Sequence, residues 1–379
     1  MVCIYGITFD HTTNYGSCLQ AYALQTAVER ITVLNERCSY RLIPLQTLLE
    51  TPPAHFTEKI KRIIYRYYRK QFKEFENRYM KFADVKKVEE LTLLNQQADA
   101  FMCGSDVVWN PDYNRKAGAY YLDFAQKYKF SYAASFGKTE FGEDDYKWIR
   151  EKLESFDEIS CRERSGVEIV RKCLNRSAEL VVDPVLLLTK EDWSSVVNDA
   201  VNTRRTEKYI FIYLTQQNRE FNNFVSKIQK ETGLKVIRSA FSINVALDQR
   251  VFMVQKPDQW LNLLKNAEYV ITNSFHATAF SVLFHKKFFT FTRPGRKKGI
   301  NIRMHDFLDG LNLGKRMISS VPDSLDLTDI DFSEADCKLE NMRQESIRFL
   351  QRNLENAYRQ RNNQEGITEN DDLILHSRL

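Results

Sequence analysis

The chain has 379 residues, which is more than one hydrophobic core usually serves, so two domains are expected. Its 43% apolar and 28% charged residues are typical of a folded globular protein and exclude a disordered one. The net charge of +5 favours anionic ligands, and the sequence has neither a zinc-type Cys/His spacing nor an RNA-binding motif, which argues against nucleic acid as a partner.

The seven cysteines are scattered in apolar contexts, as expected of reduced thiols in a cytosolic protein. The first residues, MVCIYGITFDHTT, enter an apolar strand without a basic n-region or a cleavage signal. No apolar run approaches the length that spans a bilayer. We therefore expect a cytoplasmic protein, either free or held at the inner face of the membrane.

In the first half of the chain, short apolar strands alternate with helical patterns, which predicts a parallel sheet covered by helices. An amphipathic helix begins at Ser17, and strands are expected at 2–8, 39–45, 99–103, 129–134, 156–161 and 179–183. The polar stretch NDAVNTRRTEK that follows is interpreted as a linker. The N-terminal domain is thus predicted to cover residues 1–195, with a helical insertion at about 56–95.

The same alternation restarts after the linker and predicts a second domain over residues 205–335. Its elements are strands at 209–215, 235–239, 269–272 and 287–292 and helices at 220–231, 258–266 and 277–285. A long charged helix is expected at 335–362, within a C-terminal segment 336–379 whose polar end should fray. Two such α/β units place a ligand site in the cleft between them, at the carboxyl ends of their strands.

The loop after the first strand, DHTTNYGS, combines polar side chains with a glycine just before a helix. Such a loop is suited to face a ligand, and it lacks the GxGxxG pattern of a dinucleotide site. Asn14 could equally cap the helix, with Gly16 present for backbone geometry. His11 is interpreted as a loop residue.

A second polar cluster lies in FMCGSDVVWNP, where an apolar strand leads into Asp106. A carboxylate at a strand end can take a proton from a sugar hydroxyl, and Trp109 could stack on a sugar face. Alternatively Asp106 caps a short helix and Trp109 belongs to the core.

The third cluster is CRERSG, in which a strand delivers Arg162 to the start of a helix. A guanidinium at a helix N-terminus is well suited to a bidentate contact with phosphate or carboxylate. Its neighbours Glu163 and Arg164 are interpreted as a surface pair.

The fourth cluster is EYVITNSFHATAFSVLFHKKFFTF, where a strand gives way to a helix at Ser274 and His276. A histidine there is either a core residue or a group beside the anion-favouring N–H groups of a helix N-terminus. The basic loop RPGRKKGINIR follows and adds Arg293 and Arg303 as candidates for an anionic ligand, although such charge runs are often solvated.

One segment, residues 58–82, carries a basic amphipathic pattern with no acidic residue from Lys59 to Lys73. This pattern fits either a helix with a solvated basic face or a peripheral contact with an anionic membrane.

Taken in this order, the segments resemble the polysaccharide pyruvyl transferase family. The matching stretches run from about residue 5 to 315: NYGSCLQAYAL, CGSDVVWNP, YYLDF followed by SYAASFG, CRERSG, VVDPVLLL and ITNSFHATAFSVLFHKKFFTF. The resemblance implies two Rossmann-like domains in a glycosyltransferase-B-like arrangement with the active site in the inter-domain cleft. It also implies transfer of the enolpyruvyl unit of phosphoenolpyruvate to a sugar, which yields a pyruvate ketal and phosphate without a metal or a cofactor.

Such chemistry requires a cationic pocket, an acid for the methylene carbon and a base for a sugar hydroxyl. The resemblance implies that His276 is the general acid or a phosphate ligand and that Arg162 holds phosphoenolpyruvate, with Arg303, Arg293 and Ser274 also on the donor side. Asp10 and Asp106 would serve the acceptor hydroxyls, and Asn14, Tyr15, Gly16 and Trp109 would line the acceptor site. The acceptor is a saccharide of capsule, exopolysaccharide or cell wall, either free or lipid-linked.

The chain departs from the family pattern at Ser274, where well-characterised members carry a basic residue two positions before the histidine. One anion contact is therefore either missing or supplied by Arg293, Arg296 or Lys298. Two alternatives therefore stay open: a transferase of the same architecture that uses a nucleotide-sugar donor, and a non-catalytic protein of envelope assembly.

Overall fold

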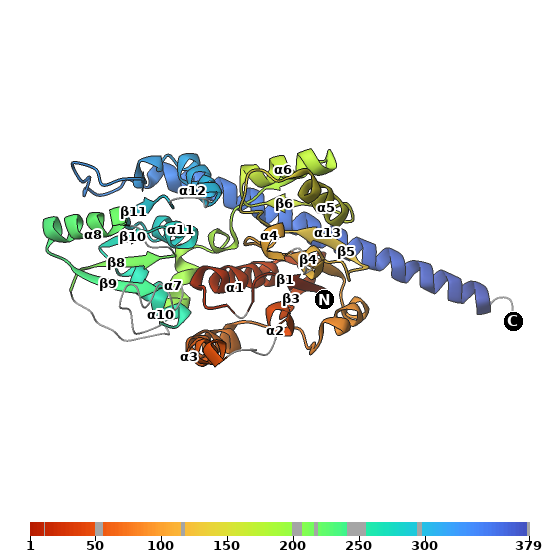
Figure 1. Ribbon diagram of the computed structural model, residues 1–379. Coiled ribbons are helices and arrows are strands. Elements are labelled where there is room, and N and C mark those ends of the chain that lie inside the picture. The colour runs from red at the N-terminus through yellow and green to blue at the C-terminus, as the bar shows by residue number, and fades with distance from the viewer. Residues whose placement is uncertain are drawn as a thin grey trace.

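A computed structural model of the chain describes residues 1–10, 12–49, 56–114, 118–198, 207–215, 219–240, 255–293 and 298–376. Most of the expected linker lies outside these residues, as do His11, Arg296 and Lys297. The side chains of residues 56–65 and of Lys298 also lie outside the description. The described residues form two α/β domains, each built on its own five-stranded sheet (Figure 1).

The N-terminal sheet has the strand order β2-β3-β1-β4-β5 and is parallel except at its short edge strand. Its strands are β1 (Val2–Ile7), β2 (Thr32–Val33), β3 (Glu36–Leu42), β4 (Ala100–Cys103) and β5 (Tyr128–Ser131). The two-residue strands β6 (Ser160–Cys161) and β7 (Glu179–Leu180) pair beside it. The helices of this half are α1 (Tyr15–Arg30), α2 (Leu45–Leu49), α3 (Phe56–Tyr79), α4 (Pro111–Asn114), α5 (Glu143–Leu153), α6 (Arg164–Leu174) and α7 (Lys190–Asn198).

The C-terminal sheet has the order β12-β11-β10-β8-β9, with all its described pairs parallel. The strands are β8 (Tyr209–Leu214), β9 (Lys235–Ala240), β10 (Tyr269–Thr272), β11 (Lys287–Phe291) and β12 (Met317–Ile318). The helices are α8 (Arg219–Thr232), α10 (Pro257–Lys265), α11 (Phe275–Leu283) and α12 (Lys298–Gly310). Strands β8 and β10 are buried along their whole length, which explains their continuous apolar sequences YIFIYL and YVIT.

Both sheets have a topological switch point, at which consecutive connections leave in opposite directions. It lies between β1 and β4 in the first sheet and between β8 and β10 in the second. Ligands of open α/β sheets bind at the carboxyl ends of the strands at such points. The switch points therefore mark where each domain should contribute to a site.

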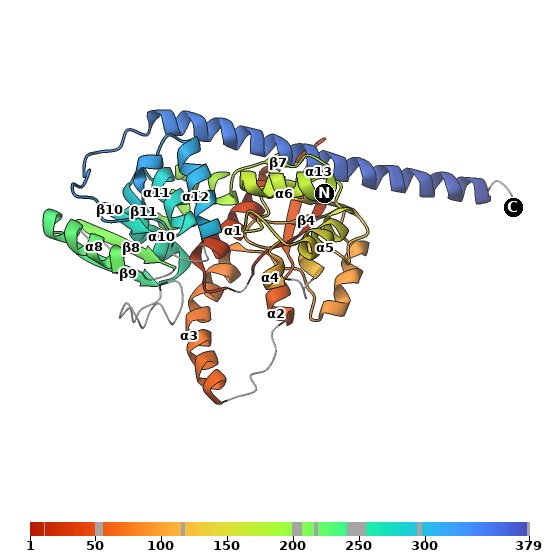
Figure 2. The same ribbon diagram turned by 45° about the horizontal axis from the view of Figure 1, so that its top comes forward.

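The two domains are joined by a continuous apolar core and by the long helix α13 (Ser333–His376). Tyr15 of α1 stacks on Trp260 of α10, with ring centroids 5.0 Å apart, and also contacts Tyr213 of β8 and Phe72 of α3. Helix α13 begins beside the C-terminal domain and runs along the N-terminal one, where Asn353 accepts a hydrogen bond of 2.9 Å from Tyr128 (Figure 2).

The structure differs from the sequence predictions in three places. The insertion is one protruding helix, α3, and the chain then continues without α-helix to a 3-10 helix at Val88–Gln96 (Figure 2). Arg303 lies on helix α12 rather than in a basic loop. The chain end expected to fray continues α13 as far as His376. Each difference concerns where a helix begins or ends, which local composition specifies only loosely.

Candidate active site

The carboxyl ends of the central strands carry polar side chains at both switch points. In the N-terminal domain, Thr8 after β1 donates a 2.6 Å hydrogen bond to the backbone carbonyl of Ser105 after β4. In the C-terminal domain, the Asn273 side chain after β10 accepts hydrogen bonds from the amide and hydroxyl of Thr215 after β8. These bonds hold the strand-to-helix turns that present Ser105 and Asp106 on one side and Ser274 and His276 on the other.

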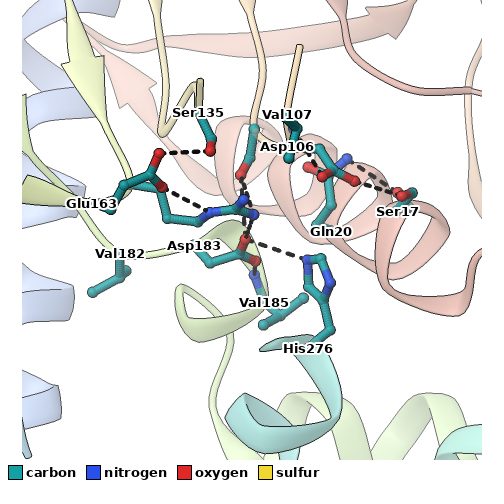
Figure 3. Close-up of polar contacts among 12 residues, drawn as sticks. Ser17, Gln20, Asp106, Val107, Ser135, Glu163, Val182, Asp183, Val185 and His276 are labelled. Carbon is teal, nitrogen blue, oxygen red and sulfur yellow. Dashed lines mark hydrogen bonds and ion pairs between the residues drawn. The ribbon is translucent and has the colours of Figure 1, made fainter. Parts of the chain in front are cut away.

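Asp183 is the centre of the polar network that joins the two domains (Figure 3). Its carboxylate accepts hydrogen bonds from Arg162 Nη1 at 2.7 Å, from Ser105 Oγ at 3.2 Å and from the Val185 amide at 3.1 Å. The Asp183 side chain is fully buried. Its Oδ2 atom also lies 3.4 Å from Nε2 of His276, which comes from the other domain.

Burial alone would raise the pKa of the Asp183 carboxyl, but the neighbouring His276 and Arg162 outweigh burial and hold that pKa well below its usual range. Asp183 is therefore a permanent anion at neutral pH. A buried carboxylate that lies between an arginine and a histidine can position both of them.

His276 lies in the first turn of α11 and is held between the domains. The residue is only 6% exposed. Its Nε2 is turned to Asp183, whereas the Nδ1 edge meets the start of α1, where a Cβ added to Gly16 would lie 2.1 Å from Nδ1. Gly16 is thus a glycine because the histidine ring occupies the space that a side chain would need.

Arg303 of α12 adds a second guanidinium to this group. Its guanidinium lies 5.7 Å from the ring centroid of Phe275, and that of Arg162 lies 4.9 Å from the same ring. The Nε and Nη1 atoms of Arg303 are buried without a hydrogen bond to any residue that the structure describes. Burial, together with repulsion from Arg162 and Arg293, lowers the pKa of Arg303 to about 9, so the group is still charged at neutral pH.

Asp106 lies opposite this cationic group with a strained backbone, at φ +84°. Its carboxylate accepts a 2.5 Å hydrogen bond from Ser17 Oγ of α1 and a 2.8 Å bond from the Val107 amide (Figure 3). Burial would raise the pKa of Asp106, yet Arg162 and His276 lower it below its usual value. The positive-φ turn places an ionised carboxylate within electrostatic reach of Arg162, His276 and Arg303.

The model of one protein family, described as polysaccharide pyruvyl transferase, matches residues 14–294. This match covers most of the chain, including Arg162, Asp183 and His276. The chain belongs to the polysaccharide pyruvyl transferase family. A comparison with proteins of curated function finds no match.

This member of the pyruvyl transferase family is similar to solved structures of low sequence identity. A proposed UDP-N-acetylglucosamine 2-epimerase from Listeria monocytogenes is similar with a TM-score of 0.50 and 11% identity, over 89% of this chain and 91% of that one. The heptosyltransferase WaaC of E. coli with ADP has a TM-score of 0.38 and 10% identity, over 90% of this chain and all of that one (100%). The first likeness supports two Rossmann-like domains in a glycosyltransferase-B-like arrangement.

Two residues expected to line the acceptor site of the pyruvyl transferase are instead core residues. Tyr15 and Trp109 are both completely buried. Tyr15 belongs to the aromatic cluster between the domains, and Trp109 packs against Tyr121, Phe136 and Phe156. Neither ring has an exposed face on which a sugar could stack, because strand ends buried under helices also bury the side chains that follow them.

The remaining predicted residues lie around the cluster rather than within it. Asn14 is the N-cap of α1, and its side chain accepts a hydrogen bond from the Gly16 amide. Asp10 accepts a hydrogen bond from the Gln46 amide at the start of α2. Ser274 is the N-cap of α11 without a side-chain cap bond, and Arg293 donates from Nε to the Asn273 carbonyl at 2.9 Å.

The interpretation of Glu163 as part of a surface pair is wrong. Glu163 is buried, accepts a 2.6 Å hydrogen bond from Ser135 Oγ, and places its Oε2 3.6 Å from Arg162 Nε. Arg164 is exposed, as expected. Alternating charges after a short strand are typical of a solvated turn. This turn instead points inward, and Arg162 compensates the charge of the buried Glu163 carboxylate.

Sequence reasoning also missed Asp183, Ser105 and Ser17. The available signal for Asp183 was its position before Pro184 in VVDPVLLL, where an aspartate caps a short helix, as it does here. Nothing local indicated that its second oxygen would meet Arg162 and His276. Among the described residues, no group of three or more His, Cys, Asp or Glu side chains is arranged to hold a metal ion.

Proposed function

We propose that this chain transfers pyruvate from phosphoenolpyruvate to a pair of sugar hydroxyls, forming a pyruvate ketal on a saccharide of capsule, exopolysaccharide or cell wall. The observation that carries the proposal is the guanidinium of Arg303 near Arg162, whose Nε and Nη1 atoms are buried without a hydrogen bond to any described residue. Buried cationic N–H groups without an acceptor are costly unless a ligand supplies one. The donor carries both a phosphate and a carboxylate, and the reaction needs neither a metal nor a cofactor.

In this proposal, Arg303 is the principal donor ligand and Arg162 contributes its remaining Nη2 atom, which makes no hydrogen bond within the described residues. Arg162 is already tied to Asp183 through Nη1. The sequence suggested Arg162 as the main donor ligand and Arg303 as a weaker one, and this assignment exchanges them. A guanidinium already bonded to a carboxylate has fewer N–H groups left for an anionic ligand.

The reaction then proceeds by addition and elimination. His276 gives a proton to the methylene carbon of phosphoenolpyruvate while a sugar hydroxyl oxygen adds to its C2 atom and loses its proton to Asp106. Phosphate leaves with the electrons of the C2–O bond. A second sugar hydroxyl adds to C2 and gives its proton to His276, which has lost its own to the methylene carbon, and this closes the ketal. Asp106 suits the role of base because its carboxylate is ionised and faces His276 and Arg162.

The test measures phosphate release from phosphoenolpyruvate by the purified protein, with and without saccharide fractions of the bacterial envelope as acceptors. Acceptor-dependent release that disappears in His276→Gln and falls steeply in Arg303→Gln is the expected result. Phosphoenolpyruvate should also raise the unfolding midpoint of the wild type by mass action, but not that of Arg303→Gln. Absence of both effects at millimolar phosphoenolpyruvate contradicts the proposal.

One observation favours a second candidate, a nucleotide-sugar donor. Ser274 stands where characterised family members carry a basic residue, and its side chain does not cap α11, so the first N–H groups of this helix are open to a diphosphate. Thermal stabilisation by a nucleoside diphosphate, without any by phosphoenolpyruvate, decides for this candidate. Saccharide binding without turnover of either donor decides for a non-catalytic role in envelope assembly.

A further inference from the structure

The two nitrogens of the His276 ring have different surroundings. Nε2 is buried and lies 3.4 Å from Asp183 Oδ2. Nδ1 lies at the start of α1, against the backbone of Gly16. The two nitrogens therefore cannot share one role.

We propose that His276 reacts through Nδ1, with Asp183 as the positioning residue that keeps the Nε2 proton and with Gly16 as the residue that admits the imidazole ring beside α1. This inference rests on the proposed function for the reaction itself, but the state of the ring does not depend on any substrate.

The charge around Asp183 determines which nitrogen carries the proton. A carboxylate oxygen only accepts hydrogen bonds, so a lone pair of Nε2 turned to Oδ2 would be repelled and an Nε2–H is attracted. The groups facing Asp183 are Arg162 and Ser105 from the N-terminal domain, the Val185 amide of its own turn and His276 from α11. Ser105, Arg162 and the Val185 amide all donate to Asp183, and the carboxylate is ionised, so it has no proton to give to Nε2.

The space at Nδ1 is set by α1. A Cβ at position 16 would lie 2.1 Å from Nδ1 and 2.4 Å from Cγ, so any other residue would displace the ring. In the reaction, the imidazolium gives its Nδ1 proton to the methylene carbon and remains neutral with its proton on Nε2. Asp183 thus holds the same N–H before and after the transfer.

The first experiment determines the tautomer of His276 by nitrogen NMR on protein labelled with ring-15N histidine. The chain has six histidines, and the spectrum of His276→Gln identifies the pair of signals that belongs to His276. At a pH where the ring is neutral, Nε2 should show the shift of a protonated nitrogen and Nδ1 that of an unprotonated one. The opposite assignment overturns the inference, whatever the substrate proves to be.

Addition of phosphoenolpyruvate should move the Nδ1 signal and leave Nε2 nearly unchanged. If neither signal moves while the tautomer is as stated, the donor assignment fails and the ring assignment stands. If Nε2 moves and Nδ1 does not, the inference fails while the donor assignment stands.

In Asp183→Asn, the His276 ring should no longer be held in one tautomer, because an amide offers both a donor and an acceptor to Nε2. The same variant should lower kcat by about 10²–10⁴-fold, as loss of an orienting aspartate does. Asp192→Asn is the matched control. Asp192 also pairs with an arginine, Arg30 at 2.8 Å, and accepts a hydrogen bond from the Thr189 amide. Within the described residues its hydrogen bonds and ion pairs involve no histidine. An Asp183→Asn protein with the wild-type tautomer and kcat contradicts the role of Asp183.

Gly16→Ala should lower kcat/KM for phosphate release by about 10²-fold or more, because a reacting group displaced by about 1 Å loses that much. Gly142→Ala is the control, since a Cβ there meets nothing within 4 Å, and it should keep wild-type turnover. Wild-type turnover of a folded Gly16→Ala protein overturns the role of Gly16. If that variant does not fold, the tautomer of the wild type still decides the proposal.

Discussion

At the scale of single residues, the site combines a compensated and an uncompensated arginine. Arg162 is balanced by Asp183 and Glu163, whereas Arg303 faces Arg162 and Arg293 without a carboxylate bound to its Nε or Nη1 among the described residues. Functional sites commonly keep such unfavourable charges because a ligand relieves them. The two arginines should therefore respond in opposite ways to removal.

Arg303→Gln should stabilise the ligand-free protein by about 1 kcal/mol, the usual size of relief at a functional site, and abolish its stabilisation by phosphoenolpyruvate. Thermal unfolding with and without the ligand measures both. Arg316→Gln is the matched control, because Arg316 lies over Phe289 much as Arg303 lies over Phe275, but it is bonded to Asp326. The control should lose stability and keep the ligand effect; a destabilised Arg303→Gln protein would contradict the prediction.

Asp183 should make stability depend on pH in the acid range. Its pKa is lowered in the folded protein, so it contributes stability above its unfolded pKa of about 3.9 and loses that contribution as the pH falls toward the folded value. Denaturant unfolding at several pH values should show the wild type losing stability below about pH 5 more steeply than Asp183→Asn. Parallel curves for the two proteins would show that Asp183 is not strongly paired.

At the scale of elements, α3 is tied to the expected acceptor loop. Arg69 forms an ion pair of 2.6 Å with Glu76, which lies seven residues further along α3. It also donates a 3.3 Å hydrogen bond to the backbone carbonyl of Thr12. On the other side, Glu74 of α3 pairs with Lys256 beside α10. The helix thus contacts both domains through charged side chains as well as through Phe72.

Arg69→Ala should destabilise the protein by about 3–5 kcal/mol, because it leaves the buried carboxylate of Glu76 unpaired. The double variant Arg69→Met, Glu76→Leu should recover most of that loss, since an apolar pair of similar volume replaces a buried ion pair at little cost. Chemical denaturation of the single and double variants measures the difference. A double variant no more stable than Arg69→Ala would show that the Thr12 contact matters more than the ion pair.

The exposed face of α3 is the described part of the predicted membrane contact at 58–82. Arg66, Lys70 and Lys73 are spaced for one helical face and are exposed, with Tyr67 beside them at 58% exposure. No helix within the described residues is long and apolar enough to cross a membrane. We propose that this face rests on anionic lipid and thereby brings the loop held by Arg69 toward a lipid-linked acceptor.

Vesicles of phosphatidylglycerol should therefore retain the wild-type protein at low salt and release it at high salt, whereas phosphatidylcholine vesicles should not retain it. A Lys70→Glu, Lys73→Glu variant should lose retention, and the control Lys147→Glu, Lys230→Glu, with exposed lysines of α5 and α8, should keep it. Equal loss in both double variants would point to overall charge instead of α3.

At the scale of the whole molecule, one apolar core includes residues of both domains. Within it, the Trp260 ring contacts Tyr15, which in turn contacts Phe72, and Trp260 also contacts Phe280. Helix α13 adds a second connection through Phe349, which packs near Tyr132. Domains joined in this way should unfold together.

Calorimetry of the wild type should accordingly show one cooperative transition, with equal calorimetric and van't Hoff enthalpies. Trp260→Ala should cost about 3–5 kcal/mol and split the transition in two, because it leaves a cavity between the domains. Separate transitions in the wild type would mean that the shared core does not couple the domains.

Much of the fold follows from local patterns. The strands predicted at 209–215, 235–239, 269–272 and 287–292 are confirmed as β8 to β11, because a buried parallel strand requires a continuous apolar run. Those expected at 156–161 and 179–183 shrink to the two-residue strands β6 and β7. How many residues of a short strand form ladder hydrogen bonds depends on neighbouring strands that are distant in the chain. Local composition gives no information about those neighbours.

For the site, the sequence by itself determined which turns carry chemistry: the family motifs place Asp106, Arg162 and His276 where strands end and helices begin. Only the tertiary structure decided which side chains from those turns meet. It buries Tyr15 and Trp109, turns Glu163 inward and brings Asp183 to His276 across the domain boundary. It also leaves Nε and Nη1 of Arg303 without a hydrogen bond among the described residues. The physical reason is that a turn is specified by neighbouring residues, whereas burial and charge pairing depend on residues from distant parts of the chain.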